Sequence, residues 1–555
     1  MNHLHSLAAL VLLAAPTILP ATRDERAAAR SVAPGDTFEF GPREAEHLLS
    51  RAGFGGRTLE VEELVRLGLD GAVASFFRPQ RVVDPFFVEH DTTFSEVRRR
   101  NTDEMAEMDS EQRRDEIRRM RNDYRRTDRR QMADYADWWV ERMLDGDDPL
   151  RDRMTLFWAG LFTSSYQEVK SSIAMIEQHR LLRDGALGSY ADLLRGIARD
   201  PAMLEYLDAA SNKKVSPNEN FARELLELFS LGEGHYAEAD IVAAARAFTG
   251  WTDRNGEFRF ARGQHDRGEK TFMGVTGKLD GSDVIEIILD QPRCADYVAL
   301  RLLRWFEGRE PSAERVAEYG KCLREADYEV RPLLEKLFTD PRFYADDVVG
   351  QRIAGPIDFL VGHARRLGVE PPARLLTLGS TTLGQTLFGP PSVKGWDGDR
   401  AWINTTTFMQ RGNLAGVLVG TIGSREFMSE AATAAMEDAG APPEMVEQRR
   451  KRRDELTRFV GQIEDVGWRP SINLSARAAR AGASSDAEVV DALAQDLLAV
   501  PLAPDSRDEL VAFLREERTA KSLPEDAWGT SDSDLEALAR RLAHLMLSLP
   551  EAQLQ

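Results

Sequence analysis

Helical periodicity runs through almost the whole chain and constrains its fold more than any other feature. Apolar residues recur three and four positions apart in "ADYADWWVERML", "LRDRMTLFWAGLFTSS", "EADIVAAARAFTGW" and "SDVIEIILDQPRCADYVALRLLRWF". The third of these segments closes at Gly250, as helices commonly do. We therefore predict a mainly α protein with a multi-helical body.

Two stretches interrupt this pattern. Between residues 257 and 275, Phe258 and Phe260 alternate with polar residues, and "ARGQHDRGEK" separates them from "TFMGV". This predicts one small β-hairpin with a long loop. Residues 384–404, "GQTLFGPPSVKGWDGDRAWIN", contain four glycines, two prolines and two tryptophans, which favours a structured loop.

The length of 555 residues exceeds what one hydrophobic core normally supports. We predict a helical main domain over residues 36–428 and a smaller C-terminal helical region over residues 429–555 that returns to the main body. A charged helical insertion is expected at residues 89–131. Twelve arginines and nine acids mix between residues 97 and 131, which is typical of an exposed helix with many ion pairs.

The N-terminal residues indicate export. "LAALVLLAAPTILP", residues 7–20, is too short to span a bilayer but suits the apolar region of a signal peptide. We predict a signal peptide and disordered leader over residues 1–35, a location in the periplasm or cell envelope, and no transmembrane span in the mature chain. The alternative is a buried or frayed N-terminal helix.

The composition excludes several classes of partner and site. A formal net charge of -20 argues against nucleic acid as a partner. Two cysteines, Cys294 and Cys322, are too few for a disulfide framework or a four-thiolate zinc site, although a single disulfide stays open.

The segment "SPNENFARELLELFSLG", residues 216–232, carries the densest group of polar candidates. Ser216 as the N-cap, Pro217 after it and Gly232 at the end predict a helix over residues 216–231. Its polar face is either solvated or lines a cleft. We predict that the face packs toward the hairpin loop, with Arg223 placed between Glu219 and Glu227.

Several segments, in this order, resemble one known family. They are "HLLSRAGFG", "PNENFARELLELFSLGEGHY", "AARAFTGW", "HDRGEKTFMG", "DGSDVIEIIL", "FGPPSVKGW", "AWINTTTFMQRGNLAG" and "LMLSLPEAQLQ". From about residue 40 to its end, the chain resembles the bacterial family known as domain of unknown function 1800 (DUF1800). The resemblance implies a largely helical, often exported protein, encoded beside a protein similar to sulfatases and alkaline phosphatases. Where members usually carry a "WHNHF"-like segment, residues 158–162 read "WAGLF" here.

The candidate functional residues fall into two groups. The catalytic candidates are Glu224, Glu227, His265 and Asp266. The binding candidates, which include arginine and lysine side chains for an anionic group and tryptophans for a sugar ring, are Arg51, Asn220, Arg223, Lys270, Trp396, Trp402 and Asn404. As alternatives, His265 stabilises the hairpin by a hydrogen bond and the tryptophans hold their loop to the helical body.

The sequence leaves metal content and cofactor unassigned, because it has no HExxH and no pair of ExxH helices. Two functions are compatible with it. The first is an accessory or binding protein that acts with a sulfatase- or phosphatase-like partner. The second is a hydrolase-type enzyme with a carboxylate and histidine cleft.

Overall fold

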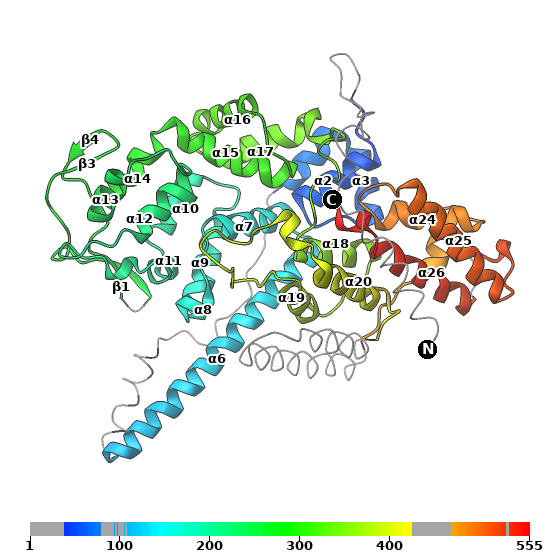
Figure 1. The fold of residues 1–555 in the computed structure, drawn as a ribbon, viewed down its shortest axis with the longest axis horizontal. Coiled ribbons are helices and arrows are strands. Elements are labelled where there is room, and N and C mark those ends of the chain that lie inside the picture. The colour runs from blue at the N-terminus through cyan, green and yellow to red at the C-terminus, as the bar shows by residue number, and fades with distance from the viewer. Residues whose placement is uncertain are drawn as a thin grey trace.

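A computed structural model describes residues 38–78, 108–254, 256–423, 468–528 and 532–555, with four isolated positions between 94 and 105. The predicted signal peptide and the predicted boundary near residue 429 lie outside these ranges. Within them the protein has 21 α-helices and two small two-stranded sheets (Figure 1), which confirms the predicted fold class.

One hydrophobic core joins the N-terminal helices to the middle of the chain. Helix α15 shows how the apolar spacing forms this core, because Val298, Leu302 and Phe306 recur every four residues on one face of the helix and are fully buried. The elements around this core are α2 (Pro42–Ala52), α3 (Thr58–Phe76), α7 (Pro149–Leu161), α10 (Tyr190–Ile197), α11 (Pro201–Tyr206), η2 (Ala209–Ser211), α12 (Asn220–Glu224), η3 (Leu225–Ser230), α13 (Glu238–Ala247), α14 (Gly281–Leu289), α15 (Pro292–Glu307), α16 (Ala313–Glu325), α17 (Val330–Thr339) and η4 (Pro341–Tyr344).

A second core gathers helices from three distant parts of the sequence. The C-terminal helices, orange to red in Figure 1, lie beside α18 and α20, and an isolated bridge pairs Ile353 with Leu554. The elements of this core are α6 (Ser110–Asp145), α8 (Tyr166–Val169), α9 (Ser172–Asp184), α18 (Pro356–Leu367), α19 (Ala373–Thr382), α20 (Thr405–Val419), α23 (Leu474–Arg480), α24 (Asp486–Leu497), α25 (Pro504–Ala520), η6 (Glu525–Ala527), α26 (Ser533–Leu547) and η7 (Pro550–Gln553). The short η5 (Asp399–Trp402), between α19 and α20 in the chain, has no buried residue.

Helix α6 has two halves of opposite character. Its first half, from the predicted charged segment, projects from the body (Figure 1) and carries i,i+3 ion pairs such as Arg119 with Glu116. Its second half buries Trp138 and Trp139 in the second core. Asp109 caps its N-terminus by accepting hydrogen bonds from the Glu111 and Gln112 amides. No helix within the described ranges is long and apolar enough to cross a membrane.

The β structure forms two short hairpins, where the sequence predicted one. Strand β1 (Trp251–Arg254) pairs antiparallel with β2 (Glu257–Phe260), and β3 (Lys270–Phe272) pairs with β4 (Val275–Gly277). Gly274, with φ of +83°, lies in the tight connection of the second hairpin. The long loop therefore links two hairpins instead of joining the two strands of one.

The predicted start of the helix at Ser216 is wrong. Ser216 forms an isolated bridge with Lys213, and α12 begins only at Asn220. The reason is a competing polar partner: the Asn218 side chain accepts the Asn220 amide at 3.0 Å, and Asn212 accepts the Asn218 amide at 2.9 Å. These bonds hold the preceding residues in a loop. The helix then widens into the π-helical segment η3, a form that is rare and often found at functional sites.

Candidate functional site

Arg223 lies on an exposed face and does not bridge the predicted pair of glutamates. Its guanidinium donates to Glu219 at 3.2 Å and to Glu238 at 2.6 Å, while Glu227 has another partner. Arg223 is 37% exposed and Glu238 is 69% exposed. Arg223 therefore pairs with Glu238 at the beginning of α13, and not with Glu227 one turn further along the helix that carries Arg223.

Glu224 and Glu227 form a half-buried carboxylate pair. Burial, and then the charge of Glu227, raises the pKa of Glu224, while Lys394 acts in the opposite direction. The Tyr236 hydroxyl donates to Glu227 at 3.2 Å, and burial followed by that carboxylate raises the pKa of Tyr236 to about 12. Lys394 belongs to the 384–404 loop, so the charge of this loop acts on Glu224.

His265 and Asp266 belong to a different network. Asp266 accepts from Arg246 at 2.7 Å, which lowers the pKa of Asp266, and its amide donates to the Thr249 hydroxyl at 2.7 Å. The His265 Nδ1 lies 3.0 Å from the Thr249 carbonyl oxygen, and its ring packs edge-on against Phe260. These contacts join the loop between the hairpins to the end of α13. No hydrogen bond or ion pair found among the described residues connects them to Glu224 or Glu227.

The remaining polar candidates mostly bind backbone groups. Lys270 is buried, and its Nζ donates to the carbonyls of Asp266, Gly268 and Leu279 at 2.6–3.1 Å. Asn404 caps α20 by accepting the Thr407 amide at 2.9 Å. Asn220 is exposed and donates to the Leu207 carbonyl at 3.3 Å.

Arg51 and Trp402 lie elsewhere. Arg51 is fully buried in α2, and among the described residues only the Val348 carbonyl accepts from it, at 3.3 Å. Trp402 is half-buried in η5, with its indole nitrogen beside Gly355. Within the described ranges, no group of three or more His, Cys, Asp or Glu side chains could hold a metal ion.

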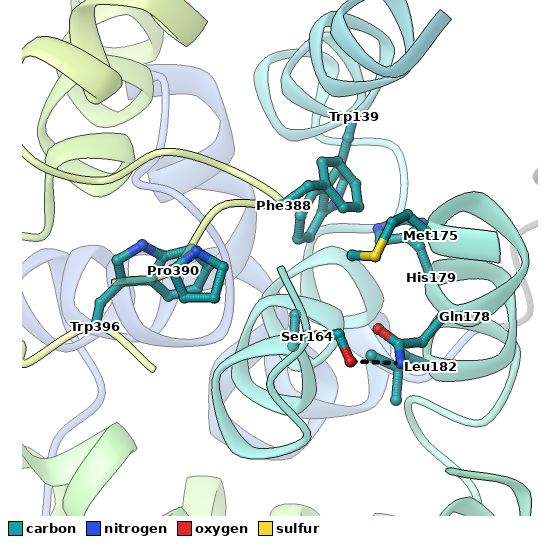
Figure 2. A pocket seen from close by; sticks show the side chains of 10 residues that line it. Trp139, Ser164, Met175, Gln178, His179, Leu182, Phe388, Pro390 and Trp396 are labelled. Atoms are coloured by element: carbon teal, nitrogen blue, oxygen red, sulfur yellow. Dashed lines mark hydrogen bonds between the residues drawn. The ribbon is translucent and has the colours of Figure 1, made fainter. Parts of the chain in front are cut away.

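A pocket between α6, α9 and the 384–404 loop brings polar nitrogens to an aromatic wall (Figure 2). Its volume is about 20 Å³. Trp396 and Pro390 lie on one side of it, and α9 supplies the other side. The lining residues are Trp139, Ala159, Ser164, Met175, Gln178, His179, Leu182, Phe388, Pro390 and Trp396.

His179 is the central polar group of this pocket. Its Nδ1 lies 2.9 Å from the Tyr135 hydroxyl, and the rings of Trp139 and Phe388 pack edge-on against the imidazole. Burial lowers the pKa of His179 to about 3, so the ring is neutral at pH 7. Its Nε2 and the Trp139 Nε1 are buried and have no hydrogen-bond partner in the described parts of the chain.

A second polar chain lies at the base of the pocket. Gln178 donates to the Ser164 hydroxyl at 2.9 Å, drawn as a dashed line in Figure 2, and to Asp200 at 2.7 Å. Burial raises the pKa of Asp200 to about 7. Asp200 also accepts the Met203 amide at 2.8 Å, which fixes its carboxyl at the start of α11.

The loop that carries Trp396 is fitted closely to α7. The Phe388 carbonyl accepts the Tyr166 amide at 2.8 Å, and Phe388 itself has a φ of +59°. A Cβ on Gly395 would lie 2.7 Å from the Gly160 carbonyl oxygen. Glycine at this position therefore permits the approach that places Trp396 at the pocket.

The comparison with protein families decides the affiliation. A family model described as "Protein of unknown function (DUF1800)" matches residues 47–554. The chain belongs to the DUF1800 family. Neither the curated proteins nor the solved structures include a match.

In this DUF1800 protein the pocket contains residues that sequence reasoning passed over. The only signals were a four-residue spacing of Tyr135 with Trp139 on one helix and of Met175 with His179 on another. Such spacings usually mark core packing. Ala159, which lines the pocket, lies within the "WAGLF" segment that departs from the usual DUF1800 pattern, so the departure falls at the wall of the pocket.

Proposed function

We propose that this DUF1800 protein is an exported accessory protein that binds the hydroxyl-bearing end of a small molecule in the pocket around His179. One observation carries the proposal: Trp139 and His179 both line the pocket, and the buried Trp139 Nε1 and His179 Nε2 both lack a partner in the part of the chain that the structure describes. Buried polar groups are normally hydrogen-bonded, so two unpartnered nitrogens beside one cavity favour an incoming oxygen.

The chemistry of the two nitrogens favours a neutral hydroxyl. Trp139 offers only a donor, whereas the neutral His179 ring presents a donor or an acceptor at Nε2, depending on which nitrogen carries its proton. A hydroxyl can accept from the indole and either donate to or accept from the imidazole. The volume of about 20 Å³ admits about one oxygen atom, so the rest of the ligand would lie against Trp396 and Pro390 at the rim.

Fluorescence titration with glycerol, D-glucose and N-acetyl-D-glucosamine tests this binding. We expect saturable quenching with at least one probe, and a loss of about tenfold in affinity in Trp139→Phe, which keeps the ring but removes the donor. Trp468→Phe is the matched control, because the Trp468 indole donates to the Glu370 carbonyl and Trp468 is not one of the residues that line the pocket. Absence of saturable binding to all three probes, or equal affinity in Trp139→Phe, would contradict the proposal.

Export and the partner are further parts of the proposal. The support for export is the apolar run at residues 7–20. The support for a sulfatase- or phosphatase-like partner is the gene neighbourhood that the family resemblance implies. N-terminal sequencing of the protein from a periplasmic fraction tests the first, and co-purification of the neighbouring gene product tests the second. An intact Met1 recovered from the cytoplasm would overturn export.

A hydrolase is the second candidate, and the carboxylate pair of η3 and α12 favours it. Burial and Glu227 raise the pKa of Glu224, as a general acid requires, beside a π-helical segment. If this function is right, p-nitrophenyl glycosides or esters are hydrolysed and Glu224→Gln lowers kcat by about a hundredfold with an unchanged melting temperature. Glu219→Gln serves as the control and should retain activity, because Glu219 is the N-cap residue of α12, at the opposite end of this helix from Glu224.

A further inference from the structure

A cluster of arginines lies at the junction of the two hydrophobic cores. Arg51 comes from α2, Arg153 from α7, Arg411 from α20, and Arg352 from the segment before α18. We call these four residues the arginine cluster. Arg51, Arg153 and Arg411 are fully buried, and the side chain of Arg352 is 13% exposed.

One carboxylate, Asp358, stands among these guanidinium groups. It pairs with Arg153 and, at 3.2 Å, with Arg352. The Gln555 side chain donates to the same carboxylate at 3.2 Å, and the Gly355 amide donates to it at 3.3 Å. The oxygens of Asp358 are therefore fully used by partners other than Arg51.

Arg51 and Arg411 form no ion pair with an acid among the described residues, and Arg411 donates to the Gln553 side chain and the Ala354 carbonyl, so fewer hydrogen bonds hold Arg51. Its Nε and Nη1 are buried and have no partner among the described residues. Burial, followed by the positive charges of Arg352 and Arg153, lowers the pKa of Arg51 well below its ordinary value. Its remaining contact, to the Val348 carbonyl, leaves the charge itself uncompensated.

Unpartnered donors recur around Arg51. The Arg352 Nη1, the Arg411 Nε and the Trp305 Nε1 are also buried without a partner in the described ranges. The Arg352 guanidinium carbon lies 4.4 Å from the centre of the Trp305 ring. Several buried N–H groups of this region therefore lack an acceptor among the described residues, which is the arrangement expected around a bound anion.

The nearest further acid does not restore the balance. Glu307 acts on Arg51, but it pairs with Arg315 and, at 3.5 Å, with Arg309. Asp399 acts on Arg352 without pairing with it, so in the described chain Asp358 is the only carboxylate that forms ion pairs with the arginine cluster, and it pairs with two of the four members. A buried positive charge without an anion is strongly unfavourable, so a negative ligand is needed to complete the site.

We propose that the arginine cluster is an internal binding site for one inorganic oxyanion, phosphate or sulfate, held mainly by Arg51 and Arg352. The planar fork of each guanidinium matches the oxygen spacing of a tetrahedral oxyanion, and the surplus positive charge compensates its negative charge. The site is separate from the pocket around His179, which presents uncharged groups. It is deeply buried, so the anion should exchange slowly and remain bound through purification.

Ion chromatography of the acid-denatured protein tests this site. Protein purified in phosphate- and sulfate-free buffer should release about one equivalent of phosphate or sulfate per chain. In Arg51→Met the released oxyanion should fall at least about tenfold. A wild-type protein that releases neither ion, and that takes up neither after refolding in about 1 mM phosphate or sulfate, would overturn the proposal.

A second buried arginine provides the matched control. Arg518 is buried and pairs with Asp486 in the C-terminal region, so Arg518→Met should destabilise the fold and still retain the oxyanion. If Arg51→Met does not fold, Arg352→Lys keeps the charge but removes the fork, and it should release less than about half of the wild-type amount. Wild-type release from Arg352→Lys would assign the anion to another site.

Discussion

Arginine meets carboxylate in two contrasting settings in this protein. On α12, Arg223 bridges Glu219 and Glu238 at the surface, and all three side chains remain at least 37% exposed. At the junction of the cores, Arg153 and Arg352 share Asp358, and none of these three side chains is more than 13% exposed. Water screens the first network and stabilises each charge separately, whereas in the second each charge depends on its neighbours.

The contrast shows that the number of charged residues in a short segment does not predict how much their ion pairs contribute to the stability of the fold. The α12 segment drew attention because its polar residues are close in sequence, but its ion pairs are screened. The members of the arginine cluster are 59 to 360 positions apart in the sequence, and their burial makes each of them hard to replace. Four predictions test this contrast.

The largest effect is expected for Asp358→Asn. This substitution leaves Arg153 and Arg352 buried without their carboxylate, and breaking a buried pair typically costs about 3–5 kcal/mol of unfolding free energy. Urea denaturation measures the change. Glu63→Gln, which removes an exposed partner of Arg66, is the control and should leave the stability nearly unchanged, because water screens this pair. Equal effects of the two variants would refute the contrast.

A buried neutral group should give the next largest effect, through pH. The pKa of His179 is about 3 in the folded protein and about 6.5 when unfolded, so the unfolded chain binds the extra proton between these values. Stability is therefore lost as pH falls below about 6.5, by roughly 1.4 kcal/mol per pH unit from this residue. His179→Gln should flatten the dependence by that slope, relative to wild type, in urea titrations from pH 6.5 to 4.5. An unchanged slope would mean that His179 is protonated in the folded state.

The comparison with wild type is essential here because other groups titrate in the same range. His363 also has a pKa lowered to about 3 by burial and contributes in the same direction. Asp200 acts in the opposite direction, because its pKa is raised to about 7 and its folded form keeps a proton that the unfolded chain loses above about pH 4. Subtracting the two curves isolates His179.

An intermediate effect is expected for Asn404→Ala. Asn404 is exposed, like Arg223, but its partner is the backbone amide of Thr407 at the start of α20. Loss of an N-cap typically costs about 1 kcal/mol. Asn404→Asp retains the acceptor and should be nearly neutral in the same denaturation experiment. A ligand-binding role would instead leave stability unchanged in both variants.

The smallest effect is expected for Arg223→Ala. The sequence interpretation, with this arginine buried between glutamates, implied a loss of about 3–5 kcal/mol. With an exposed bridge to Glu219 and Glu238, the expected loss is below about 1 kcal/mol, and added salt should reduce it further. A loss of unfolding free energy above about 2 kcal/mol, roughly twice the upper limit for a surface ion pair, would contradict the contrast between the surface network and the buried one.

The sequence by itself determined the mainly α class, the family, and the stretches that depart from helix. Repeating apolar spacing, as in α15, needs no tertiary information, because helix geometry alone places those residues on one face. The 384–404 loop was predicted from its glycines and prolines, and Gly395 indeed makes a close approach to α7. Of the binding candidates named from the sequence, Trp396 lies at the pocket around His179 and Arg51 lies in the arginine cluster.

Tertiary structure alone decided which polar residues are buried and which of them meet. The helix does not begin at Ser216, because the Asn218 side chain accepts the Asn220 amide and holds the preceding residues in a loop. His179 and Trp139 come from helices whose spacing indicates ordinary core, and only packing brings both residues to the wall of one pocket with a buried nitrogen on each that has no partner among the described residues. Arg51 and Asp358 are 307 positions apart. Burial and long-range proximity are properties of the assembled cores, because the strength of a charge's interactions depends on the solvent excluded around it, which no local spacing encodes.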